Sequence, residues 1–223
     1  MTKALFVQAM IKFFAGVLLM GLFLFVPAGT IHYPEGQLLM LVLFVPMFLA
    51  GVVMMIKSPA LLKKRLNAKE KLGKQKLVVG LSALMFIAGF VLGALSFRLN
   101  WLLLPRWVSH AGCVSFLIAY LFYAQVLREN EFLSRTIEVQ ENQHVVDTGL
   151  YGIVRHPMYS ATILLFLSMP LILRSLPALI VFLVYPALII LRLRSEEDFL
   201  EANLDGYTQY KQKVRWRLIP FIW

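Results

Sequence analysis

Long apolar runs separated by short polar connections dominate the hydrophobic pattern of this chain. Four of these runs cover residues 13–27, 37–56, 77–97 and 107–127. A run of roughly 20 residues matches a hydrocarbon core about 30 Å thick, because a helix rises about 1.5 Å per residue. The pattern therefore predicts four transmembrane helices. The composition agrees, since 60% of the 223 residues are hydrophobic, whereas soluble domains stay near about 45–50%.

A fifth apolar run, residues 160–191, is too long for a single crossing. As one helix it would measure about 48 Å, and it contains Arg174 and Pro177 near its middle. Proline removes a backbone donor and disfavours helical geometry in the residue before it. We therefore predict a helical hairpin at 158–193, with helices at about 158–173 and 177–193. Both ends of such a hairpin face the same side of the membrane.

The tail, residues 194–223, mixes charged residues with apolar ones at helical spacing. This pattern predicts an amphipathic helix at the membrane surface. We expect Trp216 and Trp223 to anchor it at the interface, and Arg215 and Arg217 to lie near the lipid headgroups. The predicted fold class is thus all-α integral membrane, with four transmembrane helices, a C-terminal membrane helical hairpin and a surface amphipathic helix.

The charge distribution predicts orientation rather than nucleic-acid binding. The net charge is +10, but the basic residues flank the spans instead of interleaving with exposed aromatic residues. Between Lys57 and Lys76 lie eight lysines and arginines against one acid, Glu70. The positive-inside rule makes this loop cytoplasmic, and with it both termini and the polar segments after residue 127; docking to anionic lipid is a weaker interpretation. A single cysteine, Cys113, excludes an internal disulfide.

The densest polar stretch is GLYGIVRHPMY at residues 149–159. It contributes Arg155, His156 and Tyr159 at the start of the predicted hairpin. The hairpin brings this stretch toward a second ionisable group at its other end: Arg192, Arg194, Glu196 and Glu197. Ionisable residues that cluster at a membrane boundary are costly and tend to be functional. We therefore predict a site formed by the two ends of the hairpin.

Each part of this cluster also has an alternative interpretation. His156 and Pro157 are typical of a helix start, with proline in the first turn and the imidazole as a cap. The two glutamates are acids of the kind that the dipole favours in the first turn of an amphipathic helix. The two arginines are of the type that extends along apolar surface to reach the headgroups. Only the predicted convergence of these residues favours a functional site.

These motifs resemble a known superfamily. The 149–159 stretch, the apolar hairpin, RLRSEE at 192–197, GYTQY at 206–210 and RLIP at 217–220 together resemble the isoprenylcysteine carboxyl methyltransferase and phospholipid methyltransferase superfamily of integral membrane enzymes. The resemblance covers about the last 80 residues, and the spacing between Leu200 and Tyr207 is similar to that of bacterial members. It implies S-adenosyl-L-methionine as methyl donor, bound between the two motifs at the cytoplasmic membrane face.

The resemblance also implies which residues form the site. The positions matching the cofactor-binding motifs are Gly149, Tyr151, His156, Pro157, Met158, Tyr159, Glu196 and Glu197. A carboxylate suits the cofactor's ammonium group and an imidazole or arginine its carboxylate, while a tyrosine ring suits its adenine. Arg192 or Arg194 would orient an acidic group of the acceptor. No glycine-rich loop of the dinucleotide-binding type and no metal-binding spacing occurs in the sequence.

The expected function is methyl transfer to a lipophilic acceptor, by resemblance an O-methyltransferase of the prenylcysteine-carboxylate type. The alternatives are a phospholipid N-methyltransferase, an S-methyltransferase, or a non-enzymatic membrane module that binds lipid headgroups. The expected partners are a lipophilic small molecule or lipidated substrate, and membrane lipid. A transporter is disfavoured because the predicted mid-membrane positions carry almost no charge. We expect a single membrane domain over 1–223, with a four-span bundle at 1–127 and a cofactor-binding region at 128–223.

Overall fold

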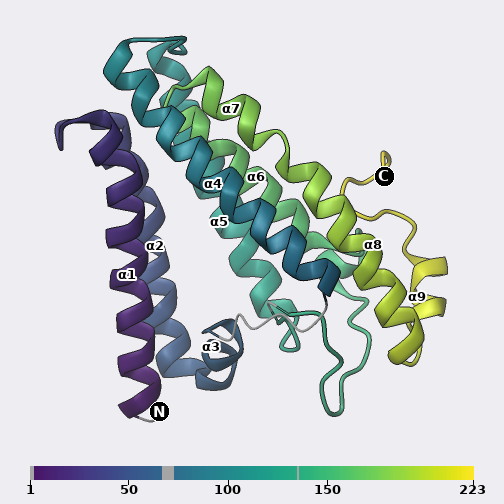
Figure 1. The fold of residues 1–223 in the computed structure, drawn as a ribbon. Coiled ribbons are helices and arrows are strands. Elements are labelled where there is room, and N and C mark those ends of the chain that lie inside the picture. The colour runs from purple at the N-terminus through teal and green to yellow at the C-terminus, as the bar shows by residue number, and fades with distance from the viewer. Residues whose placement is uncertain (1–2, 67–72, 135) are drawn as a thin grey trace.

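The four predicted transmembrane helices are present in a computed structural model, which describes residues 3–66, 73–134 and 136–223. They are α1 (Lys3–Ala28), α2 (Pro34–Lys57), α4 (Gly73–Leu99) and α5 (Arg106–Glu129), and they run side by side through the molecule (Figure 1). The first helix begins earlier than predicted, because its apolar pattern already starts ahead of Lys12. Residues 67–72 of the predicted basic loop lie outside the described residues.

The predicted hairpin is confirmed, with one interruption in its second arm. Its first arm is α6 (Pro157–Ile172), and its second consists of α7 (Leu176–Phe182) and α8 (Tyr185–Asn203). Sixteen residues make α6 about 24 Å long, which is shorter than a typical hydrocarbon core. The described chain contains five helices long and apolar enough to cross a membrane, where the fifth combines α7 with α8. The all-helical membrane fold class is confirmed.

The hairpin turns where the sequence predicts it. Arg174 has a positive φ of 55°, and Ser175 caps the next helix by accepting the N–H of Ala178 at 3.1 Å. Serine is a favoured residue at this position because its side chain replaces a missing helical partner. Pro177 follows in the first turn of α7, where its fixed φ is compatible with a helix. The turn residues therefore determine where the chain reverses.

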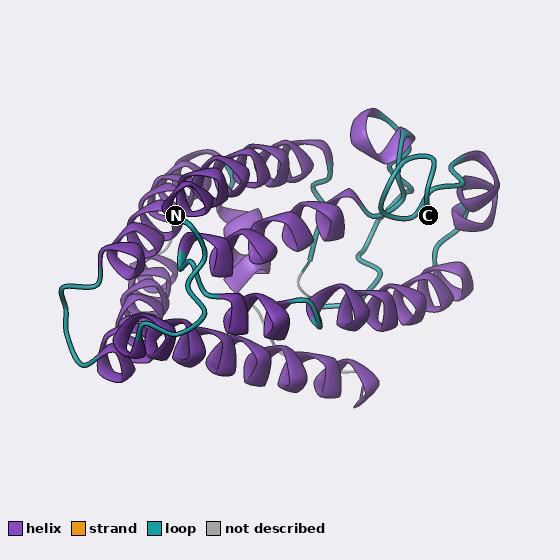
Figure 2. Ribbon diagram, turned by 90° about the horizontal axis from the view of Figure 1, so that it is seen from above, coloured by secondary structure: helices purple, strands orange, loops and turns teal. Residues whose placement is uncertain are grey.

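Small residues let the hairpin pack closely against the bundle. Gly112 in α5 faces the backbone of Ile172, where a Cβ atom would lie 2.9 Å from the backbone nitrogen. In α4, Gly89 faces the ring of Phe182 and Gly93 faces Leu173. These contacts are typical of membrane helices, in which small residues let neighbouring helices approach closely. Figure 2 shows the packed helices of the bundle from above.

The tail differs from the predicted amphipathic helix. The chain continues α8 as far as Asn203, and α9 (Tyr207–Lys213) is only seven residues long. The break occurs at Gly206, whose φ of 83° is a left-handed conformation that glycine adopts without strain. The buried residues of α9 pack against Val139 and Val145 in the loop after α5. The apolar face of α9 is therefore covered by the protein itself.

Several short elements gather at one end of the bundle, which we call the loop end. They are α3 (Pro59–Leu66), η1 (Gly149–Gly152), α9 and the loop 130–148, and they lie at the lower end of the molecule in Figure 1. Both ends of the hairpin reach the loop end. The turn at residues 173–176 lies at the opposite end, which we call the tip end.

Candidate active site

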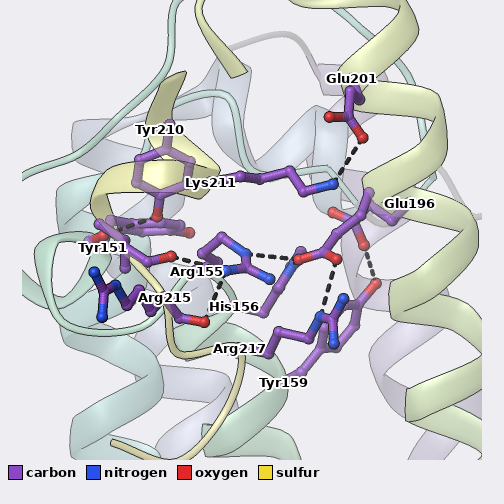
Figure 3. Close-up of polar contacts among 12 residues, drawn as sticks. Tyr151, Arg155, His156, Tyr159, Glu196, Glu201, Tyr210, Lys211, Arg215 and Arg217 are labelled. Atoms are coloured by element: carbon purple, nitrogen blue, oxygen red, sulfur yellow. Dashed lines mark hydrogen bonds and ion pairs between the residues drawn. The ribbon is translucent and has the colours of Figure 1, made fainter. Parts of the chain in front are cut away.

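Glu197 is the centre of a buried charge cluster at the loop end. Figure 3 labels its three basic partners, Arg155, His156 and Arg217. The Glu197 side chain accepts a hydrogen bond from Arg155 Nε at 2.7 Å and lies 3.2 Å from His156 Nε2, both at Oε1. Arg217 Nε donates to Oε2 at 3.0 Å. Only 3% of Glu197 is exposed, so these basic partners compensate for the cost of burying a carboxylate. The structure thus brings the two predicted motifs into contact.

A strap formed by residues 214–218 secures this cluster. Its carbonyl groups accept hydrogen bonds from the backbone N–H groups of Arg155 and His156 at 2.8 and 3.0 Å, and from Arg155 Nη1 at 2.8 and 2.9 Å. Ser160 Oγ donates to the carbonyl of Leu218 at 2.6 Å. Arg217, which was predicted to lie near the lipid headgroups, pairs with Glu197 while 32% of its side chain stays exposed.

A second hydrogen-bonded chain crosses from α6 to α8 and on to α4. The Tyr159 hydroxyl donates to Glu196 Oε2, and Arg192 Nε donates to the same hydroxyl at 3.0 Å. Arg192 Nη1 also donates to Gln75 Oε1 at 3.3 Å. Gln75 was not predicted from the sequence, where a single glutamine at the start of a span gives no signal of its partners. The chain joins three helices at the loop end.

Two alternative interpretations of the motifs are wrong in this structure. His156 occupies the position before α6, but its side chain makes no capping hydrogen bond and turns to Glu197 instead. Glu196 and Glu197 lie well inside α8 rather than in the first turn of a helix. Neither the helix cap nor the helix dipole therefore accounts for these residues.

A cavity of about 490 Å³ opens beside the cluster. The predicted site residues that line it are Tyr151, Met158, Tyr159, Arg192, Glu196 and His156, together with Arg155. Four further predicted residues are described but are not part of its lining: Gly149, Pro157, Arg194 and Glu197. The two adjacent glutamates therefore have different surroundings, one at the cavity and one inside the charge cluster.

Gly149 and Arg194, which do not line the cavity, occupy a turn and the exposed face of α8. Gly149 has a φ of 57°, and a Cβ atom there would lie 2.6 Å from the Glu129 carboxylate, which accepts the N–H of Leu150 at 2.7 Å. Gly149 thus shapes the turn rather than contacting the cavity. Arg194 is exposed on α8, because residues two apart in a helix do not share a face. The structure does not bring Arg194 to the residues around Arg192.

The polar end of the cavity contains buried groups without partners. Among the described residues, the hydroxyls of Tyr151 and Tyr207 have no hydrogen-bond partner, and both residues line the cavity. Burial raises the pKa of each tyrosine, so both retain their protons and can donate. An unpaired buried polar group costs about 1–3 kcal/mol. Such groups at a cavity indicate a ligand that completes them.

The opposite end of the cavity is apolar and reaches between the helices of the bundle. Its lining there comes from α4, α6 and α8: Val78, Val79, Phe86, Phe166, Tyr185 and Ile189. Further lining residues come from the loop after α5 and from α3: Asn130, Ser134, Thr136, Glu138, His144 and Arg65. None of this second set was predicted from the sequence, because the approach of these residues to the cavity depends on how the loop and α3 fold back.

Comparison with known families now adds to this geometry. Residues 107–205 match the family model for phospholipid methyltransferase. The matched segment runs from α5 to α8, and the match supports the superfamily that the sequence motifs resemble. Together with five helices apolar enough to cross a membrane, the match supports the class of integral membrane methyltransferases.

Two further comparisons concern curated protein sequences and solved structures. No curated protein sequence matches the chain. Among solved structures, the chain is similar to the eukaryotic intramembrane Ras methyltransferase, isoprenylcysteine carboxyl methyltransferase, solved without a monobody. The identity is 16%, the TM-score is 0.49, and the alignment covers 97% of this chain and 86% of that chain.

Proposed function

We propose that the protein transfers a methyl group from S-adenosyl-L-methionine to a lipophilic acceptor at the loop end. The observation that carries this proposal is a single cavity with unpaired hydroxyls and a carboxylate at one end and an apolar wall between membrane helices at the other. A polar cofactor and a lipophilic substrate need these two environments next to each other. The volume of about 490 Å³ lies within the range of about 300–1,000 Å³ that is typical of ligand sites.

The residues at the polar end fit the cofactor. The Tyr151 and Tyr207 hydroxyls are unpaired donors, and the carboxylate of Glu196 at the cavity is suited to an ammonium group. Glu197 is already paired with basic side chains and lies off the cavity. We therefore assign the ammonium group to Glu196 and give Glu197 the role of holding His156 and Arg155 in place.

Methyl transfer depends more on the positions of the methyl donor and the acceptor than on a reactive side chain. When bound, the cofactor supplies a methyl group on a positively charged sulfur, which is already activated for transfer. The apolar wall from α4, α6 and α8 excludes water and aligns the acceptor, and positioning of this kind contributes much of the rate in displacement reactions. Arg192 holds the Tyr159 hydroxyl at 3.0 Å, and its cationic guanidinium at the cavity suits an acidic acceptor such as a prenylcysteine carboxylate.

A second candidate function is phospholipid N-methylation, which the family match over residues 107–205 favours. The two activities differ in their labelled product. When membranes containing the protein are incubated with methyl-labelled cofactor, N-methylation labels amine headgroups with base-stable label. O-methylation of a carboxylate gives a methyl ester, which releases labelled methanol in base.

Cofactor binding is the first test of both activities. Isothermal titration of S-adenosyl-L-methionine into the purified protein in detergent should give saturable binding to one site. Absence of binding by a folded wild-type protein would contradict the proposal. Lipid binding without cofactor binding would instead support a non-enzymatic module that binds headgroups.

A further inference from the structure

The short helix α3 delivers a basic side chain to the cavity from the N-terminal half of the chain. Its buried residue Leu62 packs in one cluster with Ala9 of α1 and Met55 of α2, so α3 is fixed against the bundle. Arg65 in its last turn lines the cavity. The connection between α2 and α4, whose charge predicts only orientation, therefore also contributes to the candidate site.

Arg65 is oriented by one side chain from α5 and one from the 149–159 stretch. Its guanidinium carbon lies 5.4 Å from the centre of the Tyr123 ring, within the range of a cation–π interaction. Its Nη1 lies 3.9 Å from Met158 Sδ, and Met158 belongs to the 149–159 stretch. Both contacts hold the planar guanidinium at the cavity wall.

The adjacent residue Lys64 has different surroundings. Its Nζ donates to the carbonyl of Glu131 at 3.2 Å and lies 5.8 Å from the centre of the Phe132 ring. Lys64 is not among the residues that line the cavity. Two neighbouring cations on one short helix thus provide a site residue and a matched control.

Arg65 and Glu196 supply opposite charges to the polar end of the cavity. Both residues line it, and both act on the buried Tyr151. Burial is the main cause of the raised pKa of Tyr151; the Glu196 carboxylate raises this pKa further, whereas Arg65 opposes the rise.

We infer that Arg65 binds the carboxylate at the amino-acid end of the cofactor, with Glu196 on the ammonium group of the same end. This inference rests on the proposed function. A guanidinium matches a carboxylate in shape and binds it through two parallel hydrogen bonds. The basic connection of the N-terminal half is in this way a part of the cofactor site.

The test compares two ligands that differ only in the carboxylate. S-Adenosyl-L-methionine and decarboxylated S-adenosylmethionine are titrated into the full-length protein in detergent, as the wild type, Arg65→Gln and Lys64→Gln. We expect Arg65→Gln to weaken binding of the intact cofactor about ten- to hundredfold, the size of a charge-assisted hydrogen bond. Binding of the decarboxylated ligand should stay unchanged, and Lys64→Gln should bind both ligands like the wild type.

Equal losses for the two ligands, or no loss for either, would overturn the role of Arg65. If the wild type binds neither ligand, the proposed function itself fails, so the two failures are distinguishable. Arg65→Lys keeps the charge but loses the paired hydrogen bonds, and it should show an intermediate preference for the intact cofactor. If Arg65→Gln shows no cooperative thermal unfolding, the Arg65→Lys variant provides the test instead. If Arg65→Lys prefers the intact cofactor over the decarboxylated ligand as strongly as the wild type does, the paired contact is contradicted.

Discussion

Arginine–glutamate pairs fasten the hairpin at both of its ends, yet the two ends have different surroundings. At the tip end, Arg174 Nη1 donates to Glu35 Oε1 at 2.8 Å. Its Nε donates to the carbonyl of Leu104 at 2.8 Å, and the N–H of Leu104 returns a bond to the Arg174 carbonyl at 2.7 Å. At the loop end, Arg155 pairs with Glu197 at 2.7 Å.

The difference lies in burial and in what remains unpaired. The Arg155 and Glu197 side chains are 5% and 4% exposed, against 17% and 16% for Arg174 and Glu35. Within the described ranges, the unpaired buried hydroxyls are those of Tyr151 and Tyr207 at the loop end. An ion pair in a membrane protein therefore does not by itself mark a site. The adjoining cavity and its unpaired donors distinguish the loop end.

The largest expected effect comes from removing the Glu197 carboxylate at the loop end. Glu197→Ala leaves Arg155 and His156 buried without their partner, and breaking a buried pair in this way costs about 3–5 kcal/mol. We expect a large fall in thermal stability and loss of most cofactor affinity, measured by thermal unfolding and calorimetry in detergent. His156→Ala should also lose most of the affinity while remaining folded.

The matched substitution at the tip end is Glu35→Ala. Its pair with Arg174 is less buried than that of Glu197 with Arg155, so the loss of stability should be smaller than in Glu197→Ala, with cofactor affinity unchanged. An equal loss of affinity in Glu35→Ala and Glu197→Ala would remove the distinction between the two ends.

A substitution in the packing near the tip end should lower stability without changing binding. Gly112→Ala places a Cβ atom 2.9 Å from the backbone nitrogen of Ile172, and overpacking of this kind costs about 1–3 kcal/mol. Gly80→Ala is the control, because a Cβ atom there meets no neighbour within 4 Å. Thermal unfolding should separate the two variants, while calorimetry should find wild-type affinity in both.

A substitution at the cavity, Tyr207→Phe, should have smaller effects: stability should not fall, whereas cofactor affinity should. Tyr207→Phe removes a buried hydroxyl that has no partner among the described residues, so the free energy of unfolding should stay constant or rise by about 1 kcal/mol. Cofactor affinity should fall about tenfold, because the hydroxyl donates to the ligand. A loss of stability with unchanged affinity would show that Tyr207 has a structural role only.

The smallest effect is expected at the exposed pair of Asp147 and Lys213, in which Lys213 Nζ lies 2.6 Å from Asp147 Oδ2. The hydrogen bond and charge of Lys213 lower the pKa of Asp147. A carboxyl group with a lowered folded-state pKa stabilises the fold above its unfolded pKa, and this contribution is lost as the pH falls through the folded value. Asp147→Asn should therefore differ slightly from the wild type at pH 7 and converge with it in acid, as followed by thermal unfolding. A growing difference in acid would contradict this sign.

The sequence predicts the hairpin well because its turn has local signals. Pro177 and the length of the apolar run place the reversal near Arg174, and the reversal brings the 149–159 stretch to the glutamate pair. The break in the tail was not predicted: α8 ends at Asn203, and Gly206, in a left-handed conformation, precedes the separate short helix α9.

Other features of the site depend on tertiary structure. Glu196 and Glu197 are adjacent in α8, and because the helix is packed on several sides its sequence does not show which of them faces the cavity. Arg65 and Gln75 lie far from the motifs in sequence and reach them only through the packing of α3 and α4. By contrast, the separation of Arg194 from Arg192 follows from helix geometry, since residues two apart point to different faces.

Binding of S-adenosyl-L-methionine in the loop-end cavity is tested most directly by one calorimetric comparison. The cofactor is titrated into the wild type, Glu196→Gln and, as the tip-end control, Glu35→Gln. We predict saturable binding to one site in the wild type, wild-type affinity in Glu35→Gln, and at least a roughly tenfold loss in Glu196→Gln, whose amide keeps the shape but not the charge. Absence of binding by the wild type, or equal affinity in all three proteins, would contradict a cofactor site at the loop end.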